Sequence, residues 1–247
     1  MASSHWNLNR KSVCSLTVAA LFGFLMGGTV QAQTVEEVEK KLVDAHGKMK
    51  SYTSKTKTVQ NFDMSGMKMT SDYGGTVEWK REGDKQKFRT EMKGSTTMGD
   101  QPKMEMSVLM ISDGEFLHTV QTQMGQTSAM KQKPDTSATG DPKKLFEKIR
   151  SDNNVKIMPD AKVDGMDTYV LEVVPKTADG GPVAKSMMYF AKDTGINVKI
   201  VGFDKDGKEV FTNTTSDIKL NTEIPSDRFV FKAPEGVQVM DMTKATP

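Results

Sequence analysis

The chain is 247 residues long and nearly balanced in charge, with 34 basic and 32 acidic side chains and a formal net charge of +2. This balance argues against nucleic acid as a partner, because phosphate binding needs a basic excess or a basic patch. The single cysteine excludes a disulfide framework and a cysteine-based zinc site.

The first 32 residues resemble an export signal. Arg10-Lys11 supply a short positive region, residues 13–26 form an apolar run, and Val30-Gln31-Ala32 is similar to a signal-peptidase site. The apolar run is too short to span a bilayer. We therefore expect cleavage before Gln33, a periplasmic location, and a single domain over residues 33–247 without cysteine.

One amphipathic helix opens this domain. Thr34 can cap it, and Glu37, three residues on, can complete a capping box. Its apolar positions recur at helical spacing and are Val35, Val38, Leu42, Ala45 and Met49. A second, short helix is expected after Asp141-Pro142, with the aspartate as cap and the proline in its first turn. Its apolar side is Leu145, Phe146 and Ile149.

From Tyr52 onward the hydrophobic period changes to two, which predicts strands punctuated by turns such as Ser65-Gly66, Gly74-Gly75 and Gly83-Asp84. The predicted strands are 52–62, 68–79, 85–92, a hairpin over 104–124, 127–132, 155–158, 168–174, 185–191, 196–204, 209–220 and 229–231. So many strands with only two helices favour a closed barrel or a strongly curved sheet with helices over its opening.

The hairpin over residues 104–124 turns at Ser112-Asp113-Gly114. A two-residue turn would pair Met110 with Leu117 and mix the two faces. A three-residue turn with a glycine bulge would pair Met110 with Phe116. We expect the second register because it gathers the apolar side chains on one face.

Several segments carry a family resemblance through their order and spacing. They are the opening helix, residues 75–81 (GTVEWKR), 108–114 (VLMISDG), 169–176 (YVLEVVPK), 189–195 (YFAKDTG) and the ending from 221 to 237. Together they resemble the LolA-like family of periplasmic lipoprotein carriers over most of residues 33–247. The resemblance implies a mainly β fold with some α structure, a strongly curved antiparallel half-barrel sheet covered by a few helices.

The resemblance also implies a function. Members of this fold hold acyl chains, of a lipoprotein or of a free lipid, between sheet and helices. We therefore expect a monomeric periplasmic carrier that moves such cargo toward the outer membrane, with an inner-membrane releasing complex and an outer-membrane acceptor as partners. Some relatives sense envelope stress instead, so a lipid or stress sensor, or a scaffold of the same fold, is the alternative.

Arg81 occupies the place of a basic residue that, in the family's carriers, faces the cavity and is tied to lid closure. Independently, strand alternation puts Val77, Trp79 and Arg81 on one face. An arginine there is costly to bury unless it is paired. It could hold a lid shut through hydrogen bonds to backbone carbonyls. The alternative is an arginine at the end of a strand with its head in water.

Catalytic motifs are missing: there is no HExxH, no Gly-x-Ser-x-Gly, no phosphate loop and no catalytic cysteine. We therefore expect no enzyme activity, no cofactor and no metal site. Methionine is the unusual feature, with 19 in the chain. Flexible thioethers suit a cavity that repacks around variable acyl chains, although they also fill ordinary cores.

A rival interpretation of the methionines is a copper(I) site. The segment Met64-Ser-Gly-Met67-Lys-Met69 resembles methionine-rich sites of exported proteins, because soft thioethers favour this ion. We rank this alternative below the carrier.

The lipid cavity should be lined by apolar strand residues, with helix residues facing them. The driving force would be the burial of apolar ligand surface, about 0.8 kcal/mol per methylene. The predicted lining residues are Leu42, Met49, Val77, Trp79, Arg81, Phe88, Met104, Met106, Val108, Met110, Phe116, Phe146 and Ile200.

Overall fold

The computed structural model describes residues 33–64, 66–134, 142–177 and 181–243. These residues belong to one unit that begins at Gln33. The predicted export signal, residues 1–32, lies outside the described residues, so its cleavage stays a prediction.

In the described residues, twelve strands form one sheet, and every neighbouring pair is antiparallel except β12 and β6. The strands are β1 (Ser51–Met64), β2 (Met67–Glu82), β3 (Lys85–Met98), β4 (Met104–Ser112), β5 (Leu117–Gln123), β6 (Gln126–Gln132), β7 (Asn153–Val163), β8 (Met166–Pro175), β9 (Lys185–Ala191), β10 (Asn197–Phe203), β11 (Glu209–Leu220) and β12 (Val239–Asp241). Their order in the sheet is β12-β6-β5-β4-β3-β2-β1-β11-β10-β9-β8-β7.

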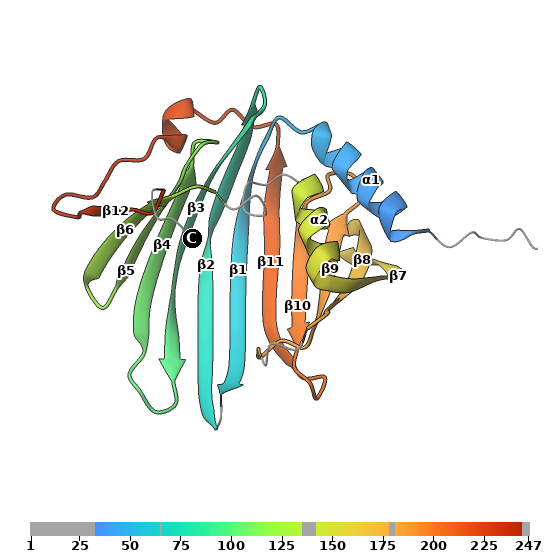
Figure 1. The fold of residues 1–247 in the computed structure, drawn as a ribbon, viewed down its shortest axis with the longest axis horizontal. Helices are drawn as coiled ribbons and strands as arrows, with labels where there is room; N and C mark the ends of the chain where they lie inside the picture. Colours follow the sequence, from blue (N-terminus) through green and yellow to red (C-terminus); the bar gives the residue numbers. More distant parts are fainter. Residues whose placement is uncertain (1–32, 65, 135–141, 178–180, 244–247) are drawn as a thin grey trace, which may run out of the picture. The chain divides into compact units, whose positions relative to one another are not determined.

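The sheet is strongly curved, and among the described residues its two edge strands, β12 and β7, do not pair with each other (Figure 1). This confirms the predicted fold class, a curved antiparallel half-barrel with a few helices. The alternative of a closed barrel is wrong.

Two helices, α1 (Val35–Gly47) and α2 (Pro142–Asp152), lie on one face of this sheet (Figure 1). The predicted capping box of α1 is present. The amide of Thr34 donates to the Glu37 carboxylate at 3.0 Å, and the amide of Glu37 donates to Thr34 Oγ1 at 3.2 Å. The cap satisfies donors that the first helical turn leaves unpaired.

The helices define what we call the inner face of the sheet. Leu42 of α1 and Phe146 of α2 pack against Leu171 of β8 and Phe190 of β9. Phe190 pairs with Tyr169, which lies two residues before Leu171 and so on the same face. Residues that are paired across two strands point to the same face, so the pairing register carries the inner face through the whole sheet. The opposite side is the outer face.

The register of the β4–β5 hairpin differs from the predicted one. Met110 pairs with Thr119, so residues 113–116 form a four-residue turn. The Asp113 carboxylate accepts hydrogen bonds from the amides of Glu115 and Phe116, both at 2.8 Å. This aspartate cap decides the turn length, and the predicted pairing of Met110 with Phe116 is wrong.

The final segment is not the strand predicted at 229–231. It contains a 3-10 helix, η1 (Ser226–Phe229), and then crosses the outer face without ladder pairing until β12 joins β6. We call residues 221–242 the strap. Because β2 and β3 are already paired on both sides, a chain that crosses them finds no free strand edge until it reaches β6, at this end of the sheet.

Side chains hold the strap on the outer face. Arg228 forms an ion pair with Glu78 of β2 at 3.0 Å, and Lys80 Nζ donates to the carbonyl oxygen of Ile224 at 3.0 Å. Farther along, the Phe231 ring stacks on His118 of β5, with centroids 4.3 Å apart. The strap therefore covers the part of the outer face that includes Glu78 and Lys80 of β2 and His118 of β5.

Two glycines explain further departures from the predicted strands. Gly74-Gly75 is part of β2 and makes no turn, and β3 continues through Gly94 to Met98 instead of ending at Met92. A Cβ on Gly75 would collide with the carbonyl oxygen of Glu91, and one on Gly94 would collide with that of Asp72. Glycine is needed where these backbones approach so closely.

The strap offers a direct test of its contribution to stability. Phe229 is 1% exposed, whereas its neighbour Val230 is 54% exposed. We expect Phe229→Ala to lower the free energy of unfolding by about 3–4 kcal/mol, because it leaves a cavity, and Val230→Ala to cost less than about 1 kcal/mol. Urea unfolding measures both. Equal losses in the two variants would contradict the packing described.

Candidate binding site

Over β8 and β9, the inner face forms a packed hydrophobic core with the two helices. Leu42 and Phe146 are at most 1% exposed and pack against Leu171 and Phe190. The rings of Phe146 and Phe190 lie 5.1 Å apart. The structure thus places these two predicted lining residues in a closed contact between helices and sheet.

A second buried cluster lies where α1 ends. Met49 and Trp79 are 5% and 2% exposed, and the Trp79 ring stacks on Tyr52 at 5.6 Å. The His46 ring meets Trp79 edge-on at 4.8 Å. Burial raises the pKa of the Tyr52 hydroxyl to about 12, so this group stays neutral.

Arg81 ties the end of α1 to the sheet. Its Nη1 donates to the carbonyl oxygen of Gly47 at 3.3 Å, and its Nη2 lies 3.5 Å from His46 Nδ1. The guanidinium carbon lies 5.5 Å from the centroid of the Trp79 ring, a cation–π distance. This is the kind of carbonyl contact that the sequence suggested for Arg81. Its role in lid closure stays a prediction.

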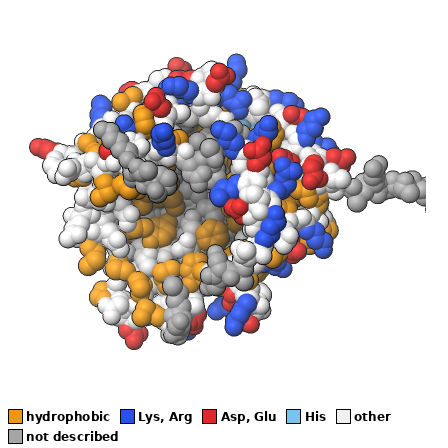
Figure 2. All heavy atoms as spheres, in the orientation of Figure 1, with side chains coloured by type: hydrophobic (Ala, Val, Ile, Leu, Met, Phe, Trp, Pro, Cys, Tyr) orange, Lys and Arg blue, Asp and Glu red, His pale blue; other side chains and the backbone are white. Residues whose placement is uncertain are grey.

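The other half of the inner face, over β2–β6, has neither described helix in front of it (Figure 1). Figure 2 shows hydrophobic side chains around a hollow on this side, whereas charged side chains crowd the helices. The pairing register puts a series of methionines on this part of the inner face. We call this part of the inner face, over β2–β6, the methionine face. They are Met69, Met92, Met98, Met104, Met106, Met110 and Met130.

Most of the predicted strand residues share the inner face. They are Val77, Trp79, Arg81, Phe88, Met104, Met106, Val108, Met110 and, on β10, Ile200. Phe116 does not join them: it lies in the turn, and Lys131 Nζ is 3.8 Å from its ring centroid. Lys131 pairs with His118, which belongs to the outer face.

Sequence reasoning missed Met92 and Met98 as members of this face. The sequence signal for these two residues is alternation, because positions 92, 94, 96 and 98 share one face of a strand. Gly94 obscures the pattern, since it has no side chain. Pairing with Val108 and Met69 places them there.

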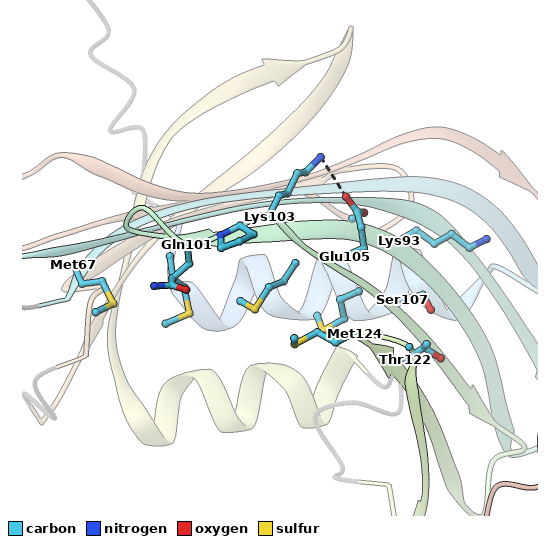
Figure 3. A pocket seen from close by; sticks show the side chains of 14 residues that line it. Met67, Lys93, Gln101, Lys103, Glu105, Ser107, Thr122 and Met124 are labelled. Carbon is cyan, nitrogen blue, oxygen red and sulfur yellow. Dashed lines mark ion pairs between the residues drawn. The ribbon is translucent and has the colours of Figure 1, made fainter.

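A pocket of about 900 Å³ lies at the end of the methionine face, where the tips of three hairpins meet. Figure 3 shows Met67 and Met124 on this pocket, and Lys103 and Glu105, which also line it, form an ion pair at 3.4 Å. Gln121 Nε2 donates to Met106 Sδ at 3.2 Å. The methionines that line this pocket, which we call the methionine pocket, are Met67, Met98, Met104, Met106 and Met124.

A smaller cavity of about 200 Å³ lies between the helices and the sheet, and we call it the helix-side cavity. Leu145 of α2 and Phe190 of β9 line it, as do Tyr52 and Ser54 of β1 and Asn197 of β10. No acidic side chain is among its described lining residues.

The described ranges lack two other features. No group of three or more His, Cys, Asp or Glu side chains there is arranged to hold a metal ion. No helix in the same residues has the length and apolar character needed to cross a membrane.

Comparisons with known proteins bear on the fold. No family model matches the chain. It is 24% identical over 227 residues to an uncharacterized protein of Methanocaldococcus jannaschii, a match that covers 91% of this chain and 59% of that protein. The chain therefore spans less than two thirds of this relative's length.

Solved structures give a further likeness. An uncharacterized conserved protein from Thermus thermophilus is similar at a TM-score of 0.54 and 10% identity, over 85% of this chain and 99% of that one. A LolA superfamily protein from Nitrosomonas europaea matches at 0.32 and 14% identity, over 81% and 99%. The Pseudomonas aeruginosa MucA/MucB complex matches at 0.44 and 15% identity, over 79% and 60%.

These likenesses concern the fold alone. The described residues form an open, mainly antiparallel half-barrel, and two helices pack on its inner face. This is the curved half-barrel with a few helices that the sequence resemblance implied.

The attachment of α1 through Arg81 can be tested directly. We expect Arg81→Met to keep the packing on Trp79 but to lose the hydrogen bond to Gly47, so amide exchange in the last turn of α1 should become about tenfold faster. Hydrogen exchange with mass spectrometry measures this change. Lys48→Met, at an exposed neighbouring position, is the control and should leave exchange unchanged. Slow exchange in the Arg81 variant would show that this contact does not hold the helix.

Proposed function

We propose that this chain is an exported periplasmic carrier that binds acyl chains of lipoproteins or free lipids on the methionine face and moves them toward the outer membrane. One observation carries the proposal: this half of the inner face is rich in apolar thioether side chains, and neither described helix covers it. A large apolar surface left uncovered on a folded protein marks a binding site.

The side chains suit this ligand. Methionine is unbranched and flexible, so a wall of thioethers can adapt to chains of different length and unsaturation. Binding would rest on burial of ligand methylenes, about 0.8 kcal/mol each, and needs no catalytic group. The proposed protein is therefore a carrier and not an enzyme.

Partners follow from this role. A carrier would act as a monomer, receiving cargo from an inner-membrane releasing complex and delivering it to an outer-membrane acceptor. A sensor or scaffold of the same fold would instead hold one fixed protein partner, and co-purification of such a partner would favour that alternative.

Native mass spectrometry of the protein from its own periplasm tests the proposal. We expect mass increments that extract as a lipid or an acylated protein. The double variant Met92→Gln/Met110→Gln should retain about tenfold less of this cargo, because it puts two polar groups on the methionine face. Met240→Gln makes the same change at a position that is 63% exposed on β12 and should carry as much cargo as the unaltered protein. Equal cargo in all three proteins would refute the assignment of this face.

Copper(I) is a second candidate ligand, favoured by the methionine pocket. Met67, of the segment proposed from sequence, lies there with four other methionines, whereas the side chain of Met64 lies outside what the structure describes. Thioether sulfur is the soft ligand type that selects copper(I).

The copper alternative has its own signature. If the methionine pocket binds this ion, titration with copper(I) under reducing conditions should add one metal mass to the native protein, and Met67→Leu/Met98→Leu/Met124→Leu should abolish the increment. Met187→Leu, on β9, is the matched control. Absence of a stoichiometric increment would remove copper from consideration and leave the acyl-chain proposal standing.

A further inference from the structure

Several buried polar atoms beneath the helices find no hydrogen-bond partner within the part of the chain that the structure describes. Ser54 Oγ and Trp79 Nε1 belong to residues that are 4% and 2% exposed, and neither finds a hydrogen-bond partner among the described residues. The same holds for Asn197 Nδ2 and for Arg81 Nε. Ser54 and Asn197 line the helix-side cavity. Unsatisfied buried polar groups are costly, so a set of them on one cavity points to a ligand.

All four groups can donate. An indole N–H, an amide NH₂ and a guanidinium N–H are donors only, and a serine hydroxyl can act either way. Trp79 does not line the cavity itself, but its ring stacks on Tyr52, which does. Arg81, beside Trp79, adds positive charge, and no carboxylate is among the described residues that line the cavity. A ligand that fits this chemistry has hydrogen-bond acceptors and is neutral or negatively charged, so that the positive charge of Arg81 does not repel it.

The sheet connects this cavity to the methionine face. Ser54 pairs with Val77, Val77 with Thr90, and Thr90 with Met110, so the four positions form one row across β1–β4. Three strand spacings cover about 14 Å, roughly the length of a 12-carbon chain. The row begins at Ser54, one of the unpaired donors, and ends at the thioether of Met110.

From this geometry we infer that the helix-side cavity binds the carboxyl oxygens at the head of an acyl chain, with Ser54 and Asn197 as donors and the tail running along the row toward Met110. The inference rests on the proposed acyl-chain function and adds what the site recognises: the oxygen-bearing end of a fatty acid or of its ester. A donor-only head group could pair with the Ser54 oxygen but would leave Asn197 Nδ2 without an acceptor.

Three ligands with the same 12-carbon alkyl length separate the possibilities: dodecanoate, methyl dodecanoate and dodecylamine. Calorimetric titration of the full chain gives the affinities, and Trp79 fluorescence reports on the cavity in a Trp6→Phe background, where Trp79 is the only tryptophan. We expect dodecanoate to bind at least tenfold more tightly than dodecylamine. A higher affinity for dodecanoate than for methyl dodecanoate would identify a free fatty acid as the ligand. Equal affinities for the two compounds would identify an ester.

Variants test the named donors. Ser54→Ala/Asn197→Ala should weaken dodecanoate about tenfold and leave dodecylamine unchanged. Ser216→Ala, whose partner Lys55 is highly exposed, is the matched control and should change neither affinity. Asn197→Asp should reverse the preference toward dodecylamine, which keeps the test decisive if the double variant folds poorly.

The outcomes separate the two proposals. Equal binding of dodecanoate and dodecylamine would overturn the head-group site and leave the acyl carrier standing. No binding of any of the three ligands would overturn the acyl carrier itself, and the head-group site with it.

Discussion

Each strand of this sheet shows alternate side chains to opposite faces, so the pairing register decides which residues meet. From β2 to β6 the register runs without a shift, and it aligns the methionines of β3 and β4 on one face. A slip of one residue would turn these side chains toward the strap. Local devices such as the Asp113 cap hold the register, and the rest of the architecture depends on it.

The two helices divide the inner face. Over β8 and β9 they close a core around Phe146 and Phe190, whereas the methionine face stays uncovered by them. Arg81 and Trp79 stand at the boundary, where α1 ends on the sheet. The helix-side cavity lies next to this boundary, because His46 of α1 and Tyr52, on which Trp79 stacks, are among its lining residues.

The chemistry of the inner face changes along its length. Unpaired donors lie beneath the helices, and thioethers lie toward the hairpin tips. Burial of apolar surface is non-directional, whereas hydrogen bonds to buried donors depend on direction and on ligand type. An amphiphile with an acceptor head and an apolar tail matches both regions at once.

Local signals in the sequence determined the two helices, nearly all strands and the shared face of Val77, Trp79 and Arg81, because caps, turns and alternation act over a few residues. The tertiary structure alone decided the β4–β5 register, the path of the strap and the unpaired donors at Ser54 and Asn197. It also decided that Leu42 and Phe146 pack in a filled core. Alternation says which residues share a face, but only long-range packing says what covers that face.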